Sequence, residues 1–247
     1  MRCDICIPAY NEALIIKTST QRVLDFCKQK LNNLDWQIVL VINGSNDASP
    51  LIAQELSSSD IKIKKIIFTE PGRGQALKKY WQQSQAEIVC YMDSDLAVDL
   101  VSLPKLLEPI IKHEADLVYG NRYHKLATVE RSLLRELSSR MYNLIARAIL
   151  GHKQKDLQCG FKALNKEAFL KLSDKANDPG WFFDTELILW SNKLGLKTKD
   201  VPVNWRETRL GARPSKVKLI STTINFIKRL LSLKKQLKQY NPTKTTL

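Results

Sequence analysis

Short apolar runs alternate with amphipathic segments throughout the first half of the chain. The runs at 3–7, 36–42, 63–69, 88–92 and 116–119 are short and rich in Ile, Val and Leu, as expected of strands. The segments between them, at 11–30, 49–56, 74–85 and 103–113, read as helices. This alternation is typical of a mostly parallel, Rossmann-like sheet with helices on both faces. The pattern therefore predicts an α/β fold.

Longer helices dominate the second half. Between 132 and 150, apolar residues recur at helical spacing, namely Leu134, Leu137, Met141, Leu144 and Ala148. Polar residues spaced by four share another face of the same helix, namely Arg131, Arg135, Ser139 and Asn143. A helix from about 184 to 194 and a late strand at 199–205 follow.

A final amphipathic helix is predicted from 217 to 240. Its apolar side includes Phe226, Leu230, Leu233 and Leu237, and basic residues lie opposite. A basic amphipathic helix can rest on an anionic membrane, pack on its own domain or bind a partner. We therefore expect one large domain at 1–216, this helix at 217–240 and a disordered tail at 241–247.

Polar residues gather where the predicted strands end. They are Tyr10-Asn11-Glu12, Asn43-Gly44-Ser45, Arg73-Gly74 and Asp93-Ser94-Asp95. Ligands of parallel α/β sheets bind beyond the carboxyl ends of the strands. The convergence of four such segments therefore predicts one ligand site.

Two carboxylates, Asp93 and Asp95, directly follow the apolar run 88–92. Residues i and i+2 of an extended segment point to the same side, so the pair can face one ligand. Nearby carboxylates repel each other unless a cation lies between them. A divalent ion that holds substrate phosphates satisfies this need. The alternative for an isolated Asp-x-Asp is a solvated acidic turn.

Length and composition narrow the class of protein. A chain of 247 residues fits one large domain, or one domain with an appendage. No apolar run approaches the roughly 18 residues of a membrane span, and the first residues enter a strand pattern without a signal-peptide layout. A cytoplasmic location is expected.

The cysteines and histidines give no sign of a metal site. Cys3 and Cys6 lie in one predicted strand on opposite faces, which favours core thiols. The three histidines form no cluster with the spacing of zinc ligands.

The net charge of +14 is concentrated in the second half. Residues 1–120 carry 13 Lys and Arg against 15 Asp and Glu, whereas residues 121–247 carry 26 against 10. This asymmetry indicates an anionic partner for the second half. Nucleic acid, an anionic membrane and a phosphorylated substrate all remain open.

The motifs and their order resemble the inverting family 2 glycosyltransferases over residues 3–220, and within them the polyprenyl- or dolichyl-phosphate hexose synthases. The motifs are Ile7-Pro8-Ala9-Tyr10-Asn11-Glu12, Asn43-Gly44-Ser45, Gly72-Arg73-Gly74, Met92-Asp93-Ser94-Asp95-Leu96, Gly120-Asn121-Arg122-Tyr123, Arg135-x-x-x-Ser139, Asp156-x-x-Cys159-Gly160-Phe161-Lys162, Phe183-Asp184-Thr185-Glu186, Val201-Pro202-Val203 and Ser215-Lys216-Val217. Each motif alone is weak, and their common order makes the resemblance specific.

The resemblance implies a GT-A fold that binds a UDP- or GDP-hexose. It assigns donor binding to Pro8, Ala9, Tyr10, Glu12, Asn43, Asp47, Arg73, Gly74 and Ser94. Asp93 and Asp95 would hold Mg²⁺ or Mn²⁺, and Arg122, Arg135 and Ser139 would bind the acceptor phosphate. Asp93, Asp95, Arg122 and Arg135 would form the catalytic set.

An acceptor phosphate accounts for the lack of a dedicated base. A hydroxyl acceptor needs a general base, but a phosphate monoester is already largely anionic at neutral pH. A single displacement with inversion follows. Two departures from the family pattern matter: Ile42 replaces an acid, and Ala97 replaces a Gln that assists the metal, a role that Asp99 could take.

Other functions stay open at this stage. The fold also supports transfer to a saccharide or small-molecule hydroxyl. The chain could be a catalytically silent relative or, in another class, a non-enzymatic nucleic-acid-binding protein, although the strand-end carboxylates would then repel phosphate. Without membrane spans, the enzyme is expected to be peripheral on the cytoplasmic face of a membrane, through its final helix or a membrane-protein partner.

Overall fold

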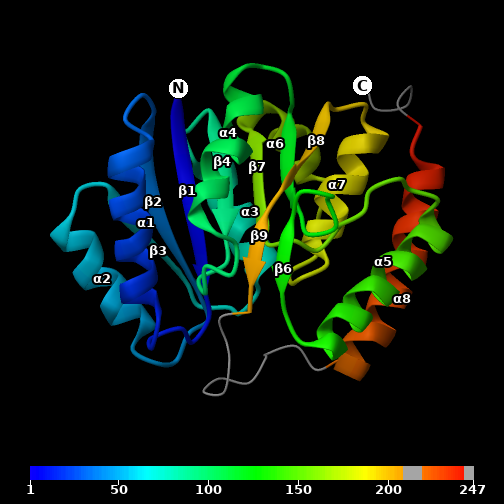
Figure 1. The fold of residues 1–247 in the computed structure, drawn as a ribbon, viewed down its shortest axis with the longest axis horizontal. Helices are drawn as coiled ribbons and strands as arrows, with labels where there is room; N and C mark the ends of the chain where they lie inside the picture. The colour runs from blue at the N-terminus through cyan, green and yellow to red at the C-terminus, as the bar shows by residue number, and fades with distance from the viewer. Residues whose placement is uncertain (208–218, 242–247) are drawn as a thin grey trace.

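A seven-stranded sheet forms the centre of the computed structural model, which describes residues 1–207 and 219–241 except the side chains of 134, 135 and 219–224 (Figure 1). The strands are β1 (Arg2–Ala9), β2 (Asp35–Asn43), β3 (Ile63–Phe68), β4 (Ile88–Met92), β5 (Leu117–Asn121), β7 (Phe161–Asn165) and β8 (Thr198–Pro202). Their order is β3-β2-β1-β4-β7-β5-β8, and only β7 runs antiparallel to its neighbours. The predicted α/β fold with a mostly parallel sheet is confirmed.

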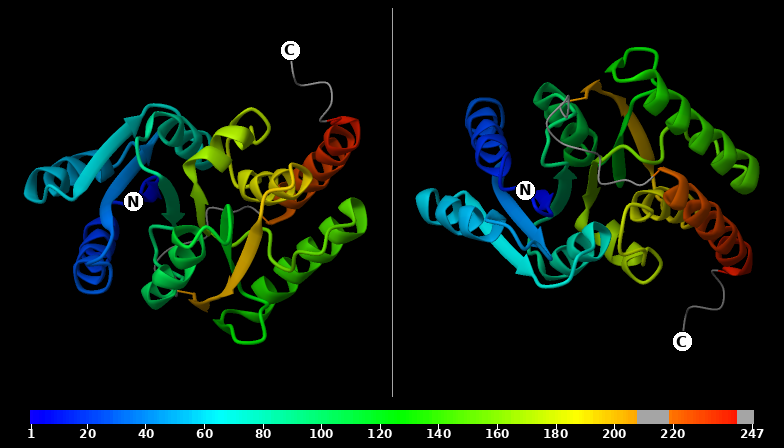
Figure 2. Two further views of the ribbon diagram at one scale, coloured as in Figure 1. Left: turned by 90° about the horizontal axis from the view of Figure 1, so that it is seen from above. Right: turned by 90° about the horizontal axis from the view of Figure 1, so that it is seen from below.

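Helices cover both faces of the sheet (Figures 1 and 2). On one face lie α1 (Ile16–Lys30), α2 (Ser49–Ser59), the short 3-10 helix η1 (Leu100–Ser102) and α4 (Leu103–Ile111). On the other lie α3 (Arg73–Gln83), α6 (Lys166–Ser173) and α7 (Phe183–Lys193), with α5 (Leu133–Leu150) and α8 (Leu219–Gln239) beyond them. A small parallel pair, β6 (Thr128–Glu130) and β9 (Asn204–Arg206), flanks the sheet.

Successive side chains of β1 pack alternately into two separate hydrophobic cores, one on each face of the sheet. Cys3, Ile5 and Ile7 pack with α1 and α4, whereas Cys6 packs with α3. The prediction that Cys3 and Cys6 face opposite sides is therefore confirmed. All five cysteines are buried and unbridged, and burial raises the pKa of Cys27 to about 12. They are core residues rather than reactive thiols.

The sequence pattern missed β7 and α6. Strand β7 inserts between β4 and β5 and is buried on both faces, so it lacks the alternation that marks a strand. The predicted late strand at 199–205 is two strands, because the chain leaves the large sheet after Pro202 and joins the small one at Asn204.

The final helix packs on the domain, which is one of the three positions that its sequence left open. Leu230 and Leu233 of α8 are fully buried. The Phe226 ring packs at a tilt against Tyr142 of α5 and Phe182, with ring centroids 5.2 and 5.9 Å apart. Residues 217, 218 and 242–247 of the predicted helix and tail lie outside the described part of the chain. Within that part, no helix is both long and apolar enough to cross a bilayer.

Candidate active site

A cavity of about 320 Å³ opens at the carboxyl ends of β1, β2 and β4. It is lined by Pro8, Tyr10, Glu12, Asn43, Pro71, Gly72, Arg73, Asp93, Ser94, Gly180 and Trp181. Most residues that the sequence assigned to donor binding therefore come together here. Ala9, Asp47, Gly74 and Asp95 do not line it. Pro71, Gly72, Gly180 and Trp181 were missed as site residues. Gly72 belongs to a quoted motif and Pro71 precedes it, whereas Gly180 and Trp181 lie shortly before the motif that begins at Phe183.

Asn43 joins the three segments that form one wall of the cavity. It is buried, its Nδ2 donates to the Ala9 carbonyl at 2.9 Å, and its Oδ1 accepts from the Gly72 amide at 3.3 Å. One side chain thus ties the ends of β1 and β2 to the turn before α3. Ala9 contributes to the site through its backbone carbonyl.

Asp47 has a supporting position behind the cavity. Its carboxylate accepts from the Ser49 amide at 2.9 Å, at the start of α2, and from the Ala13 amide at 3.0 Å. Burial alone would raise the pKa of Asp47, but these hydrogen bonds lower it. The side chain thus connects the segment after β1 to the start of α2.

Arg73 projects from the first turn of α3 into the cavity and is almost fully buried. One terminal nitrogen binds Asp93 at 2.8 Å, the other binds Asp184, and the guanidinium lies over the Trp181 ring at 4.1 Å. Burial would lower the pKa of Arg73, but the two carboxylates outweigh it and raise the pKa. Arg73 is therefore a fixed cation in the wall of the site.

Gly74 allows this close packing. A Cβ at this position would lie 2.6 Å from the Phe183 Cβ and 2.5 Å from the Asp178 carbonyl oxygen. The start of α3 can approach α7 only without a side chain there. Gly74 thus positions Arg73 rather than contacting the cavity itself.

A buried ionic network lies beneath Arg73. Lys162 on β7 and Asp184 on α7 are both inaccessible, and the Lys162 Nζ lies 2.9 Å from the Asp184 carboxylate. Lys162 also donates to the Cys159 carbonyl at 2.6 Å, and the Tyr91 hydroxyl donates to Asp184. Burial lowers the pKa of Lys162 to about 7 and raises that of Asp184 to about 6. The sequence signal was present, since both charges lie within aromatic and aliphatic runs.

The residues present fit a divalent metal ion only in part. Asp93 lines the cavity, whereas the Asp95 carboxylate accepts from the Ala97 amide at 3.2 Å and does not line it. No cluster of three or more His, Cys, Asp or Glu suited to a metal occurs in the described ranges. Hard carboxylate oxygens suit Mg²⁺ and Mn²⁺, so phosphate oxygens of a donor would have to complete the shell.

Asp99 does not replace the missing Gln at Ala97. Its carboxylate accepts from the Val101 amide at 3.3 Å and begins η1, outside the cavity. Among the residues that the structure describes, Asp93 and Asp95 are therefore the candidate metal ligands at this position.

Gly160 shapes the position of Asp93. The Asp93 amide donates to the Gly160 carbonyl at 3.2 Å, and a Cβ on Gly160 would overlap the Asp93 carboxylate. We expect Gly160→Ala to displace that carboxylate and weaken Mn²⁺ binding in the presence of nucleoside diphosphate by about tenfold, with an overpacking cost of ~1–3 kcal/mol. Titration followed by Mn²⁺ paramagnetic resonance measures this. Binding of nucleoside diphosphate without Mn²⁺ is the control and should change by less than about twofold, because the three atoms nearest a Cβ on Gly160 all belong to Asp93. An equal loss with and without Mn²⁺ would contradict the steric argument.

A second cationic group lies on the β5 side of the site. Arg122, which follows β5, forms a two-pronged ion pair with buried Asp156 through Nε at 2.7 Å and Nη2 at 2.8 Å. Burial would raise the pKa of Asp156, but Arg122 outweighs it and the pKa is lowered. Within the described residues, Nη1 is the guanidinium nitrogen of Arg122 that makes no hydrogen bond. Arg122 is thus held rigidly, with its Nη1 left to donate to an anion.

Ser139 belongs to a neighbouring polar cluster. The Tyr123 hydroxyl donates to its Oγ at 2.6 Å, and Arg131 donates to the Tyr123 oxygen at 3.1 Å. Arg135 lies on α5, but its side chain is outside the described part of the structure. The segment from Asp156 to Gly160 connects the two regions, since one end binds Arg122 and the other contacts Asp93.

The family model of Glycosyl transferase family 2 matches residues 4–173. The chain belongs to glycosyl transferase family 2. The match includes the strand ends around the cavity, Asp93 and Arg122. The family resemblance expected from the ordered motifs is therefore confirmed.

Two relatives in the family illustrate the range of similarity. Glycosyltransferase AglD of Haloferax volcanii is 32% identical over 203 residues, which make up 82% of this chain and 32% of that protein. A dolichyl-phosphate beta-glucosyltransferase of Saccharomyces cerevisiae is 25% identical over 223 residues, 83% of this chain and 66% of that protein. The chain therefore spans about a third of the first relative and 66% of the second.

Solved structures show the same fold. Glucosyl-3-phosphoglycerate synthase of Mycobacterium tuberculosis in complex with uridine diphosphate has a TM-score of 0.69 at 22% identity, covering 95% of this chain and 80% of that one. Mannosyl-3-phosphoglycerate synthase of Rubrobacter xylanophilus has a TM-score of 0.70 at 15% identity, covering 100% and 78%. The GT-A fold implied by the sequence motifs is thus confirmed.

Proposed function

We propose that this protein transfers a hexose from a nucleoside-diphosphate sugar to a polyprenyl phosphate, with a divalent metal ion and with inversion at the anomeric carbon. The observation that carries the proposal is the pairing of two adjoining sites. A cavity with Arg73 and Asp93 lies at the strand ends, and the cationic group around Arg122 and Ser139 lies across the segment 156–160. The relatives named as dolichyl-phosphate glucosyltransferases support the choice of acceptor.

The donor would occupy the 320 Å³ cavity. Pro8, Tyr10 and Glu12 would contact the nucleoside, and Arg73 would face its diphosphate with the guanidinium nitrogens and a buried positive charge. Asp93 and Asp95 would hold Mg²⁺ or Mn²⁺. Such an ion stabilises the charge that develops on the departing nucleoside diphosphate.

The acceptor phosphate would bind between Arg122, Arg135 and Ser139. A phosphate oxygen carries its own negative charge and needs no base to become a nucleophile. Transfer to a hydroxyl would need a general base. Within the described residues, the carboxylates that line the cavity are Glu12 and Asp93, which the proposal assigns to the nucleoside and the metal ion. Asp184 lies outside the lining, buried and bound by Arg73, Lys162 and Tyr91, so transfer to a hydroxyl is less well supported.

Arg135→Ala tests the acceptor assignment. We expect the KM for polyprenyl phosphate to rise by about 10- to 100-fold, the effect of losing one charge-assisted phosphate contact of ~1.5–3 kcal/mol, with the donor Kd unchanged. Steady-state kinetics and donor titration measure the two quantities. Arg22→Ala, an exposed arginine on α1, is the matched control. A weakened donor Kd would instead move Arg135 into the donor site.

The product itself tests the function. Purified protein is incubated with UDP-glucose or GDP-mannose, Mn²⁺ and a short-chain polyprenyl phosphate, and the lipid fraction is weighed by mass spectrometry. We expect a lipid heavier by one hexose, with the anomeric configuration opposite to that of the donor. A protein that acts on the sugar nucleotide but never modifies the lipid would contradict the proposed acceptor.

We also infer a peripheral position on the cytoplasmic face of a membrane. The acceptor is a membrane lipid, and the basic half of the chain, with 26 Lys and Arg against 10 Asp and Glu, contains α5 and α8. Anionic lipid headgroups attract such a surface. Binding to nucleic acid lacks comparable support, because the carboxylates of the cavity would repel a polyanion.

A further inference from the structure

Helix α5 exposes an apolar stripe to the outside of the molecule. Leu133, Leu137, Met141 and Leu144 are 87%, 62%, 49% and 60% exposed, and Ala148 is exposed as well. At 100° per residue these positions lie within about 80° of the helix circumference. Most soluble proteins bury such a continuous apolar face, so this stripe indicates a partner.

The stripe is separate from the face of α5 that packs on the protein. Ala146 is buried, and Tyr142, Ile145 and Ile149 pack against the core. Helix α8 likewise turns Leu230 and Leu233 inward. Figure 2 shows α5 at the outer edge of the molecule, beside α8. Of these two helices, α5 therefore carries most of the uncovered apolar surface. Among the described side chains of α8, Leu231 is the one large apolar residue that is strongly exposed.

Basic residues border the stripe on one side. Arg140 and Arg147 lie about two helical turns apart, and both are exposed. Arg140 pairs with Glu136, whereas Arg147 forms no ion pair in the described part of the chain. Leucine and methionine on one face with flanking arginines is the composition of helices that lie in the interface of an anionic bilayer.

We propose that α5 is the membrane-contacting element, lying flat on an anionic bilayer with the stripe Leu133, Leu137, Met141 and Leu144 at the boundary of the acyl chains. The proposal rests on the proposed function, because it names the surface through which that site reaches its lipid. It assigns the membrane contact to α5 rather than to the basic helix α8.

The geometry of α5 connects this contact to the acceptor site. Ser139 lies about 200° around the helix from Leu137, on the opposite side from the stripe. A helix is about 10 Å across, and the headgroup layer of one leaflet is roughly 5–8 Å thick. With the stripe at the acyl boundary, Ser139 lies about 10 Å above it, at or just beyond the outer edge of the headgroup layer. The helix would thus set the height of the acceptor phosphate relative to the site.

A double variant, Leu137→Gln with Leu144→Gln, tests the proposal by flotation with vesicles of phosphatidylcholine and phosphatidylglycerol. We expect vesicle association at least about tenfold weaker than in the unaltered protein, ~1.4 kcal/mol. Binding to vesicles of phosphatidylcholine alone should be weaker for the unaltered protein. Both leucines are exposed, so the thermal unfolding midpoint should not change.

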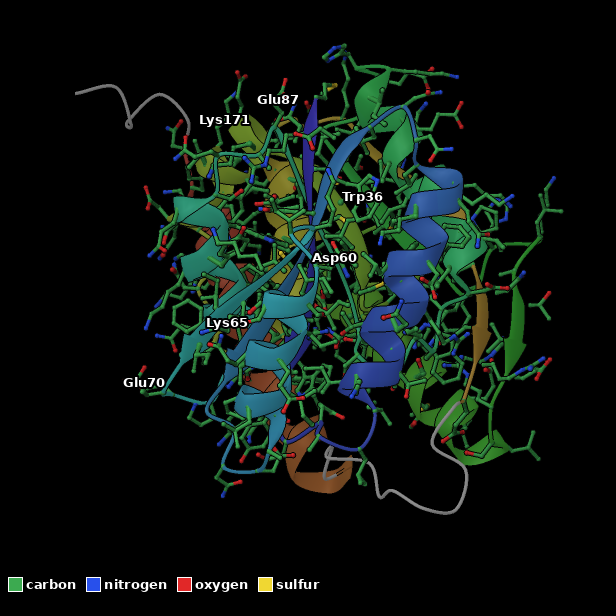
Figure 3. All side chains as sticks on the ribbon, turned by 90° about the vertical axis from the view of Figure 1, so that its left-hand side faces the viewer. Trp36, Asp60, Lys65, Glu70, Glu87 and Lys171 are labelled. Carbon is green, nitrogen blue, oxygen red and sulfur yellow. The ribbon has the colours of Figure 1, made fainter. Side chains whose placement is uncertain are left out.

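Two single variants serve as controls. Leu51→Gln removes a leucine 69% exposed on α2. Helix α2 lies at the opposite end of the molecule from α5 (Figure 1) and faces the viewer in Figure 3, where Asp60, at its C-terminal end, is labelled. Leu231→Gln removes a leucine 53% exposed on α8. Both should associate with vesicles as the unaltered protein does. If Leu231→Gln lowered vesicle association more than the double variant does, α8 would be the membrane-contacting helix and the proposal would be overturned.

Other outcomes are equally decisive. Full association by the double variant, or no association by the unaltered protein, overturns the proposal. A dimer that the double variant dissociates, measured by light scattering, would show that a second copy covers the stripe. Turnover of a water-soluble short-chain polyprenyl phosphate should be unchanged in the double variant. If even the unaltered protein fails that reaction, the proposed function fails, while the flotation result stands on its own.

Discussion

Asp93→Asn is expected to lower kcat/KM by about 10²–10³, the loss that follows removal of one group aimed at developing charge in an active site. Asp93 is the carboxylate that lines the cavity and faces Arg73 at 2.8 Å. The amide keeps the shape of the side chain but cannot neutralise a divalent cation. Initial rates at saturating Mn²⁺ measure the loss, and Mn²⁺ titration with nucleoside diphosphate measures the binding that accompanies it.

Asp99→Asn is the control for this variant. Asp99 lies in the same connection, but its carboxylate begins η1 and is outside the cavity. Its replacement should leave kcat/KM within about twofold of the unaltered value, as a surface substitution does. Asp95→Asn should also reduce metal-dependent turnover. Retained turnover in both Asp93→Asn and Asp95→Asn would remove the metal assignment.

Asp184→Asn is expected to destabilise the protein by ~3–5 kcal/mol, because it leaves the buried ammonium of Lys162 without its carboxylate partner. The same substitution weakens the contact of the Arg73 guanidinium with residue 184, so Arg73 is held less firmly in the cavity wall and donor binding should weaken as well. Urea denaturation measures the free energy of unfolding. Asp174→Asn, at an exposed position just after α6, should change that free energy by less than about 0.5 kcal/mol.

A double variant separates the two roles of Asp184. Lys162→Met combined with Asp184→Asn removes both charges of the pair, so no buried ammonium is left without its carboxylate partner. Stability should therefore recover relative to Asp184→Asn alone, while donor binding stays weak because Arg73 still lacks Asp184. Additive losses of stability in the double variant would show that Lys162 and Asp184 do not interact.

Local patterns were sufficient for the strand-end residues of the site. The run at 88–92 and the acids after it lie close together in sequence, and a parallel sheet brings its strand ends to one edge. That reasoning led to Asp93, Asn43 and Arg73, which line one cavity. The buried residues that hold Arg73 in place could not be predicted from local sequence patterns. Lys162 and Asp184 meet only because β7 enters the sheet antiparallel beside β4 and α7 packs beneath it.

The two amphipathic helices show a second limit of sequence patterns. The spacing of Leu137, Met141 and Leu144 predicted a helix with an apolar stripe, and that helix exists. Spacing does not say which face is covered. In α5 the second apolar face, with Tyr142 and Ala146, packs inward, and the regular stripe remains outside. In α8 the opposite occurs, because Leu230 and Leu233 meet α5 and α7.

The most direct measurement of the central claim compares polyprenyl phosphate with the corresponding polyprenol as acceptor, at equal concentration and chain length, with the same sugar nucleotide and Mn²⁺. The account predicts transfer to the phosphate and a rate for the alcohol lower by at least about 10²-fold, because Asp184 is held in the buried network and the alcohol brings no charge of its own. Equal rates for the two acceptors, or transfer to the alcohol alone, would contradict it.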